Sequence, residues 1–398
     1  MGSVDILNVR IVVATPSLPL PFGTADARWL HVVVTELARR GHHVVCLSCT
    51  EEGPERIAAA GASADHHGFQ LRHVPMRLSE HPVRRKLHSF RRPFSEYVRV
   101  PELVRALDEE AGAADVVHIE HLFPGWLGLD RDDAVTYLHH LEVIDWEHRT
   151  DLSRRERTTR MQMERATQHL LCRLPRIIGA TSRLTDRVGD YQPGVAAEVV
   201  PVSIDPSCYE VLPLPDRPVV GVIGSMHWYP SRSAAERVLT RLWPQIHRAV
   251  PEARLVVAGW GSEVALGHLF PLPGAELLGA VERPEDFFGW INTLLYPPAR
   301  GSGFKIKVLE SMAYGRAVVS NSEGLEGLTD RPNPIGPPLD EDHALIDRTI
   351  ELLHDGAERA RLGAAGRQLV DEVYSPRPAI DRLEAAYQHL GVGARVGR

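Results

Sequence analysis

Two stretches of the chain, one in each half, show the same alternation of strand and helix signals. In the first, a β-branched run at 8–14 precedes a Pro- and Gly-rich loop, a helical pattern at 27–40 and another apolar run at 43–47. In the second, a short strand at 219–223 leads through a helical pattern at 233–249 to a strand at 254–258. A strand, a helix and a strand in this order predict a βαβ unit with parallel strands. The sequence therefore predicts an α/β protein with two Rossmann-like, doubly wound domains.

Further short apolar runs extend both predicted sheets. Those of the first half lie at 71–74, 115–119, 134–138, 176–180 and 198–200. In the second half, strands at 293–296 and 317–320 flank a predicted helix at 305–314. Each half thus has enough strands for a sheet of its own.

A Pro-rich stretch at 212–218 separates the two halves and is typical of a linker. We therefore expect an N-terminal domain over 1–211 and a C-terminal domain over 212–375. The terminal segment 376–398 opens with a run whose apolar spacing predicts an amphipathic helix.

Composition argues against several classes of protein. Hydrophobic residues form 43% of the 398 residues and charged residues 24%, as in soluble globular chains. The net charge of -7 argues against nucleic acid as a partner. No run approaches 18 apolar residues, and four cysteines are too few for a disulfide scaffold. We expect a cytoplasmic protein in which Cys46 and Cys49 are packed thiols.

Two well-known nucleotide motifs are missing from the sequence. Neither half carries GxGxxG after its first strand, so the main sequence evidence for a nicotinamide-binding protein is missing. GxxxxGK[ST] does not occur either, which argues against a P-loop nucleotide-binding protein. Ligands of open α/β sheets bind outside the carboxyl ends of the strands, and both domains would present these ends to one cleft. Another motif must then hold the ligand.

The segment 299–328 combines the features of an anion site. Gly301 and Gly303 lie in a loop that leads into the predicted helix, and glycines let a ligand approach the backbone. The N–H groups at a helix N-terminus suit a phosphate. Lys305 and Lys307 add cations in the first turn, where cations are unfavourable unless an anion is bound. The alternative is a surface helix with solvated lysines.

This segment resembles the donor-binding motif of family 4 glycosyltransferases, which are retaining enzymes of the GT-B fold. The resemblance extends over nearly the whole chain, through four further motifs at 39–44, 199–205, 221–230 and 255–261. It implies two Rossmann-like domains facing a central cleft, with the last helix crossing back to the N-terminal domain.

The resemblance also implies roles for individual residues. Glu310 would bind the ribose of a sugar nucleotide, and His118 would be the active-site histidine near the transferred sugar. These two and Lys305 are the expected catalytic residues, and Val281 matches the position that cradles the base. The remaining substrate contacts are expected at Gly23, Gly224, Ser225, Gly303, Phe304, Ile306 and Lys307. Of these, Gly23 would lie near the donor phosphates or near the acceptor.

Two features depart from the family pattern. The first Glu of the family's Glu-x7-Glu motif is Ser302 here, and no Arg and Lys pair follows the first strand of the second domain in the right register. We expect Lys305 and Lys307 to supply the missing positive charge to a pyrophosphate leaving group. Lys305→Ala should then lower kcat/KM more than about tenfold.

The resemblance implies an enzyme that transfers a sugar from a nucleoside diphosphate sugar. The expected donors are UDP- or TDP-sugars, and no cofactor or metal is expected. The acceptor, a small molecule or a glycan, would enter through the N-terminal domain, in glycan or natural-product biosynthesis. The alternatives are a sugar-nucleotide epimerase or hydrolase or a pseudo-glycosyltransferase of the same fold, or a non-catalytic sugar-nucleotide-binding subunit. The oligomeric state is left open.

Three weaker signals lie in the first half. His139, His140 and Glu142 follow a predicted strand and line the cleft or lie in a solvated loop. The basic stretch 83–94 could contact an anionic acceptor or a membrane surface, but a solvated segment is the favoured interpretation. The Asp-x-Asp at 130–132 sits in a turn, and we do not expect it to hold a metal.

Overall fold

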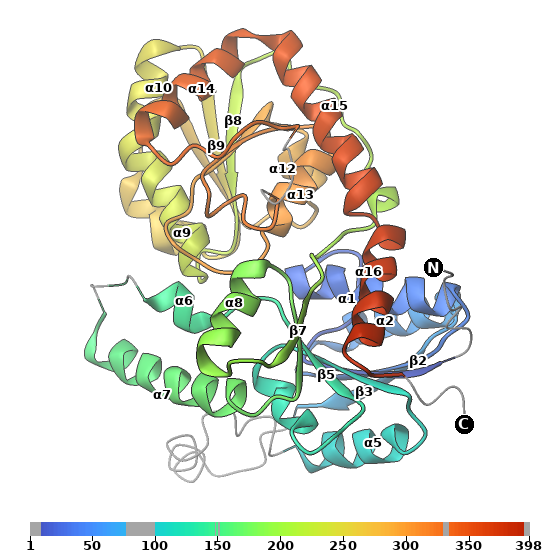
Figure 1. Cartoon of the computed structure of the whole chain (residues 1–398). Helices are drawn as coiled ribbons and strands as arrows, with labels where there is room; N and C mark the ends of the chain where they lie inside the picture. The colour runs from blue at the N-terminus through green and yellow to red at the C-terminus, as the bar shows by residue number, and fades with distance from the viewer. Residues whose placement is uncertain (1–8, 77–99, 148, 150–151, 329–333, 394–398) are drawn as a thin grey trace. The chain divides into compact units, whose positions relative to one another are not determined.

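The computed structural model (Figure 1) describes residues 9–76, 100–147, 149, 152–328 and 334–393. The chain divides into two compact units, Met1–Val202 together with Pro376–Arg398, and Ser203–Ser375. The second unit thus begins before the expected position 212, and the C-terminal helix belongs to the first unit. The basic stretch 83–94 lies outside the described residues.

The first unit is built on a seven-stranded sheet in which every neighbouring pair is parallel. The strands lie in the order β3-β2-β1-β4-β5-β6-β7. Their bounds are Arg10–Thr15 (β1), His43–Thr50 (β2), Gln70–Pro75 (β3), Val116–Glu120 (β4), Ala134–Leu138 (β5), Arg176–Gly179 (β6) and Ala196–Val199 (β7). The inner strands are buried almost throughout, as parallel strands covered by helices on both faces must be. The predicted parallel α/β fold is confirmed for this half.

Helix α1 (Ala25–Arg39) shows how the local sequence dictates these elements. Its apolar residues Leu30, Val33 and Leu37 recur on one face and are buried. Gly41 follows with φ +91°, a left-handed conformation that glycine adopts without strain and that turns the chain into β2. The other helices of the unit are α2 (Pro54–His67), α5 (Pro101–Ala111), α6 (Glu142–Trp146), α7 (Arg154–Leu171), α8 (Ser182–Tyr191) and α16 (Pro376–His389).

The second unit is built on a five-stranded parallel sheet with the order β10-β9-β8-β11-β12. Its strands are Val219–Ile223 (β8), Arg254–Ala258 (β9), Ala275–Gly279 (β10), Thr293–Tyr296 (β11) and Ala317–Ser320 (β12). Strand β10 was not predicted, because it is an edge strand whose Glu276 is exposed and whose leucines are only partly buried. The other four strands have the predicted bounds.

The helices of this unit cover both faces of its sheet, with α10 and α14 on one face and α12, α13 and α15 on the other (Figure 1). The predicted helix at 233–249 is one run that starts earlier and contains a π-helical turn at Val238–Leu242, just before Pro244. Proline has no N–H to donate to the preceding turn, which accounts for the irregular hydrogen bonding there. The helices are α9 (Tyr229–Arg237), α10 (Trp243–Ala249), α11 (Ser262–Leu266), α12 (Glu285–Phe288), α13 (Ile306–Ala313), α14 (Asp342–His354) and α15 (Gly356–Val373).

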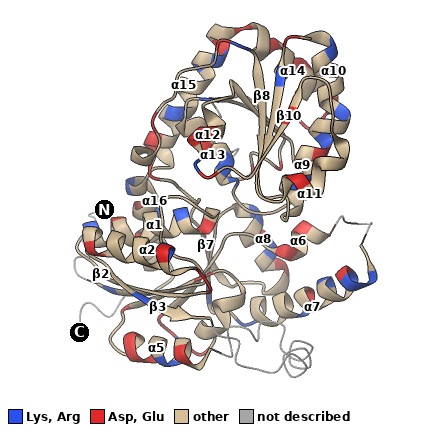
Figure 2. Cartoon of the chain, turned by 180° about the vertical axis from the view of Figure 1, so that it is seen from behind, with Lys and Arg blue, Asp and Glu red and all other residues tan. Residues whose placement is uncertain are grey.

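Charged residues lie mainly on the helices and loops of both units, whereas the strands are mostly uncharged (Figure 2). Cys46 and Cys49 are buried in β2, as expected for packed thiols. Within the described part of the chain, no helix is both long enough and apolar enough to cross a bilayer.

Candidate functional site

The strand order of each sheet reverses at one place, between β1 and β4 in the first unit and between β8 and β11 in the second. In open α/β sheets, ligands bind outside the carboxyl ends of the strands at such a reversal. The residues that follow these four strands are therefore the candidates for a site.

In the second unit, Gly224 follows β8 in a space that admits no side chain. A Cβ atom there would lie 2.5 Å from Ser231 Oγ and 3.2 Å from Lys307 Cε. The turn after β9 packs against the backbone of Gly224. A Cβ on Gly259, whose φ is +128°, would lie 1.9 Å from the carbonyl oxygen of Gly224. Glycine at position 224 therefore lets the backbone, Ser231 and Lys307 meet at the end of β8. Ser225, the next residue, is partly buried.

Lys307, in the first turn of α13, lies at this strand reversal. Its Nζ donates hydrogen bonds to Ser231 Oγ at 2.9 Å and to the Tyr296 hydroxyl at 3.1 Å. The ammonium also lies 5.0 Å from the ring centroid of Trp228 and 4.5 Å from that of Tyr296. Aromatic faces and hydroxyls stabilise a cation without neutralising its charge. The arrangement therefore holds a positive charge beside a helix N-terminus, where a phosphate would bind.

Lys305 shares one neighbour with Lys307, the ring of Trp228, whose centroid lies 5.7 Å from Lys305 Nζ, but its other contacts differ. It is 2% exposed, and its Nζ donates to the carbonyl oxygens of Gly303 and, at 3.3 Å, of Ser302. The same Nζ lies 3.6 Å from Glu326 Oε2. In this structure Lys305 therefore balances a buried carboxylate, and Lys307 is the lysine at the strand reversal.

Two glutamates that follow β12 hold the glycine loop. Glu323 accepts a hydrogen bond from the Gly301 N–H at 3.2 Å, and Glu326 accepts one from the Gly303 N–H at 3.2 Å. Gly303 has φ +79°, which favours glycine at this turn. The N–H groups of Gly301 and Gly303 thus donate to carboxylates of the protein itself.

The other predicted donor residues of this unit are spread over the loop, α13 and the sheet edge. Phe304 is buried, as is Ile306, the first residue of α13. Glu310, on α13, is 5% exposed, and its Oε1 accepts a hydrogen bond from the Tyr209 hydroxyl at 3.5 Å. Val281 follows β10, the edge strand, and is partly buried.

In the first unit, the two residues predicted for the site differ in exposure. Gly23 is exposed in the loop after β1 with φ +121°, and a Cβ there would lie 2.9 Å from Arg56 Nη2. His118, in contrast, is fully buried within β4. Its Nδ1 lies 2.7 Å from the Tyr387 hydroxyl and its Nε2 lies 2.9 Å from Glu120 Oε1. The imidazole of His118 therefore contacts protein groups on both nitrogens.

His121 follows β4 directly and faces the reversal of the first sheet. Its Nε2 lies 3.3 Å from Asp26 Oδ2, and Asp26 also accepts a hydrogen bond from Ser17 Oγ. Burial alone would raise the pKa of Asp26, but the hydrogen bond and charge of His121 hold that pKa well below its ordinary value. Among the described residues, His121 is the one non-glycine residue with a positive φ, +71°. Such strain is found preferentially at functional sites.

Glu120 connects His118 to a second histidine at the same sheet edge. Its Oε2 lies 2.5 Å from His139 Nε2, and the ring of His139 stacks on that of His121 with centroids 4.4 Å apart. Burial would raise the pKa of Glu120, but the attraction and hydrogen bonds of His139 and His118 lower it to about 2. Glu120 is therefore an ionised acceptor between two imidazoles.

His140 and Glu142 form a further pair after β5, with His140 Nε2 3.5 Å from Glu142 Oε1. Burial would lower the pKa of His140, but Glu142, Asp145 and Asp26 raise it to about 9. The sheet edge thus carries ionised carboxylates and a charged imidazole, which can bind hydroxyl and phosphate groups. Within the described part of the chain, no group of three or more His, Cys, Asp or Glu residues is placed to hold a metal ion.

Sequence reasoning missed Asp26, His121, Glu323 and Glu326. The position of His121 gave a usable signal, because it follows a buried strand directly, where α/β sheets place ligand-binding groups. The partners of Asp26 and of the two glutamates lie in other segments, so their roles depend on tertiary structure.

Two family models match the chain, one in each half. The model described as Glycosyltransferase Family 4 matches residues 27–207, and the model described as Glycosyl transferases group 1 matches residues 217–355. The chain is a glycosyltransferase of the GT-B fold, with a family 4 domain followed by a group 1 domain. No curated protein sequence matches it.

Solved structures of several glycosyltransferases share this fold over their whole length. HepE from Anabaena, solved in complex with UDP, is 12% identical with a TM-score of 0.66, and the match covers 95% of this chain and 99% of HepE. TarM from S. aureus is 10% identical with a TM-score of 0.65, covering 95% and 99% of the two chains. WaaG, a glycosyltransferase of lipopolysaccharide biosynthesis, is 16% identical with a TM-score of 0.60, covering 96% and 100%. At these identities the similarity shows the fold alone.

Proposed function

We propose that this glycosyltransferase moves a sugar from a UDP-sugar to a hydroxyl group of a small-molecule or glycan acceptor, with retention of configuration at the anomeric carbon. The observation that carries the proposal is the position of Lys307, a residue of the first turn of α13. Its side chain passes Gly224, which follows β8, and its ammonium donates to the hydroxyl of Tyr296, the last residue of β11. A diphosphate needs such a charge both when bound and when it leaves.

The donor proposal follows from the groups around this lysine. Lys307 would contact the diphosphate, and the carboxylate of Glu310, one turn further along α13, would accept hydrogen bonds from the ribose hydroxyls. The structurally similar HepE was solved with UDP, with UDP and glucose, and with UDP-glucose, which favours uracil as the base. A TDP-sugar is the second donor to test.

Retention is supported by the family resemblance and needs no protein nucleophile. In a front-face reaction, the bond between the anomeric carbon and the diphosphate oxygen breaks as the acceptor oxygen attacks from the same side. The acceptor proton passes to the departing diphosphate, whose negative charge Lys307 stabilises. Because this lysine supplies positive charge, we propose that transfer proceeds without a metal ion.

The acceptor is proposed to bind in the first unit, at the carboxyl ends of β1, β4 and β5. Asp26 and His121 lie at the sheet's reversal point, and His140 adds positive charge nearby. These groups suit an acceptor rich in hydroxyls. We place the reaction in the cytoplasm, since the described cysteines are all free thiols and Cys46 and Cys49 are buried.

The test is turnover of UDP-glucose, TDP-glucose and other nucleotide sugars with a panel of sugar and small-molecule acceptors, followed by NMR of the product. An α-linked product from an α-linked donor supports the proposal. A changed donor sugar without acceptor points to an epimerase, free sugar points to a hydrolase, and transfer of a pseudo-sugar points to a pseudo-glycosyltransferase. Donor binding without turnover across the panel would make the chain a binding subunit.

A further inference from the structure

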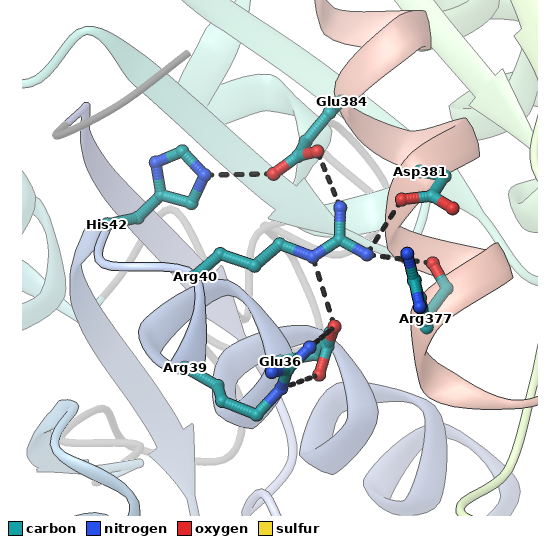
Figure 3. Close-up of polar contacts among 7 residues, drawn as sticks. All are labelled: Glu36, Arg39, Arg40, His42, Arg377, Asp381 and Glu384. Atoms are coloured by element: carbon teal, nitrogen blue, oxygen red, sulfur yellow. Dashed lines mark hydrogen bonds and ion pairs between the residues drawn. The ribbon is translucent and has the colours of Figure 1, made fainter. Parts of the chain in front are cut away.

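The C-terminal helix α16 is attached to the first unit by a ring of charged groups around Arg40 (Figure 3). Arg40 donates to Glu384 at 2.7 Å and to the carbonyl oxygen of Arg377 at 2.8 Å. It also pairs with Asp381 at 2.8 Å and with Glu36, on α1, at 3.0 Å. These contacts fasten the N-terminal turns of α16 to the end of α1.

A second attachment lies further along α16 and is of another kind. The hydroxyl of Tyr387 lies 2.7 Å from His118 Nδ1, and both side chains are buried. His118 belongs to β4, in the middle of the sheet order, so a helix at the end of the chain contacts the centre of the first unit. This contact joins α16 to groups that reach the candidate site.

The hydrogen bonds continue from His118 to the sheet edge. His118 Nε2 lies 2.9 Å from Glu120 Oε1, and Glu120 Oε2 lies 2.5 Å from His139 Nε2. The ring of His139 stacks on His121, which pairs with Asp26 at the reversal between β1 and β4. Four side chains, Tyr387, His118, Glu120 and His139, thus form one chain of contacts from α16 to the candidate site.

The chemistry of these groups fixes where the protons lie. Ionised Glu120 can only accept hydrogen bonds, so Nε2 of His118 and Nε2 of His139 must both carry hydrogen. In a neutral His118, Nδ1 is then an acceptor, and the Tyr387 hydroxyl must donate to it. The alternative tautomer of His118 would turn a lone pair toward the carboxylate of Glu120.

We propose that Tyr387 is a positioning residue for the transfer reaction: its hydroxyl holds the ring of His118 through Nδ1, in the tautomer that Glu120 imposes, and through Glu120 it sets the orientation and basicity of His139 beside His121. The proposal rests on the proposed function insofar as it concerns rates. Its structural part, the coupling of Tyr387 to His139, stands on the geometry alone.

The direction of the coupling follows from polarisation along the chain. A hydroxyl that donates to Nδ1 makes the Nε2–H of His118 a stronger donor, which draws charge from Glu120. Without the hydroxyl, Glu120 attracts the proton of His139 more strongly, and the pKa of His139 rises. The other titratable groups that interact electrostatically with Glu120 are Cys46 on β2 and Tyr137 on β5. Those around His139 are His121, Asp26 and Tyr137, whose ring centroid lies 4.8 Å from that of His139.

The variant that tests this coupling is Tyr387→Phe, which removes only the hydroxyl. Its matched control is Glu384→Gln, which lies one turn earlier on α16 and weakens the contacts with Arg40 and His42. The charge of Glu384 acts on Tyr387 through space, but the variant leaves the contact between Tyr387 and His118 in place. The readouts are the NMR titration of the His139 imidazole, the pH profile of kcat with UDP-glucose, and the Kd of UDP measured by calorimetry.

We expect Tyr387→Phe to raise the pKa of His139 by roughly half a unit or more and to lower kcat about tenfold, with the Kd of UDP unchanged within about twofold. Glu384→Gln should leave the His139 titration and kcat as in the wild type. Equal effects of the two variants would overturn the proposal, because they would trace the effect to loosening of α16. An unchanged His139 titration in Tyr387→Phe would also overturn it.

A double-mutant cycle with His118→Gln separates action through His118 from a general effect on folding. If Tyr387 acts through His118, adding Tyr387→Phe to His118→Gln should change kcat by less than about twofold. A tenfold further loss would contradict the proposal. If the wild type binds UDP but transfers no sugar, the proposed function fails, while the His139 titration still decides the coupling.

Discussion

His121 Nε2 lies 3.3 Å from Asp26 Oδ2, and this contact joins the end of β4 to the first turn of α1 across the reversal of the first sheet. The second unit places Lys307 at the equivalent reversal of its own sheet, between β8 and β11. Each unit therefore holds charged groups at the position where α/β sheets bind ligands.

Removing the Lys305 charge should reduce stability more than removing the Lys307 charge. Lys305→Met leaves the carboxylate of Glu326 buried without its cation, which should lower the free energy of unfolding by about 3 kcal/mol. Lys307→Met should lower it by less than about 1 kcal/mol, since Lys307 is only partly buried. Urea denaturation of both variants measures the difference.

The double variant Lys305→Met with Glu326→Gln controls for loss of packing at Lys305. It should recover part of the stability, because no buried charge is left unpaired. If the double variant were less stable than Lys305→Met alone, the ion pair would not explain the effect. The expected loss of kcat/KM in Lys305→Ala, which assigns Lys305 a role on the donor diphosphate, is tested separately by steady-state kinetics.

Acid should destabilise the first unit through Glu120. Its pKa in the folded protein, about 2, lies below its ordinary value of 4.5. Ionised Glu120 therefore stabilises the fold above pH 4.5, and this contribution, about 3 kcal/mol, is lost as the pH falls from 4.5 towards 2. Denaturation curves between pH 6 and 3 should show a smaller loss for Glu120→Gln than for the wild type. Parallel pH dependences would show that Glu120 is not ionised in the fold.

Gly224→Ala should damage the donor site. The added Cβ would meet Ser231 and displace Lys307, which should lower kcat/KM at least about tenfold and destabilise the protein by about 1–3 kcal/mol. The matched control is Gly189→Ala on α8, where a Cβ meets no atom within 4 Å. Steady-state kinetics of both variants is the measurement, and equal activities would show that the crowding at Gly224 has no role in transfer.

The sequence predicts the buried parts of the fold well and its contacts poorly. The bounds of β5, β8, β9, β11 and β12 agree with the apolar runs, because strands buried on both faces are continuous apolar segments. Strand β10 lacks such a run, since it is a partly exposed edge strand. Helix bounds shifted by a few residues, as at α9, where Pro230 lies in the first turn.

The candidate site was predictable in its location but not in its pairings. Lys305 and Lys307 look alike in the sequence, and only the folded chain shows that Glu326 lies beside the first and Ser231 beside the second. Likewise His118 is separated from Tyr387 by 269 positions, so no local pattern indicates that the two meet. His121 was within reach of sequence reasoning because it directly follows β4.

The most direct test of the account is calorimetric titration of UDP into the wild type and Lys307→Met. Arg241→Met, which removes an exposed cation from the same unit, serves as the control. We predict that Lys307→Met raises the Kd of UDP at least about tenfold, equivalent to about 1.4 kcal/mol, and that Arg241→Met leaves it unchanged. An unchanged Kd in Lys307→Met would contradict the placement of the diphosphate at this lysine.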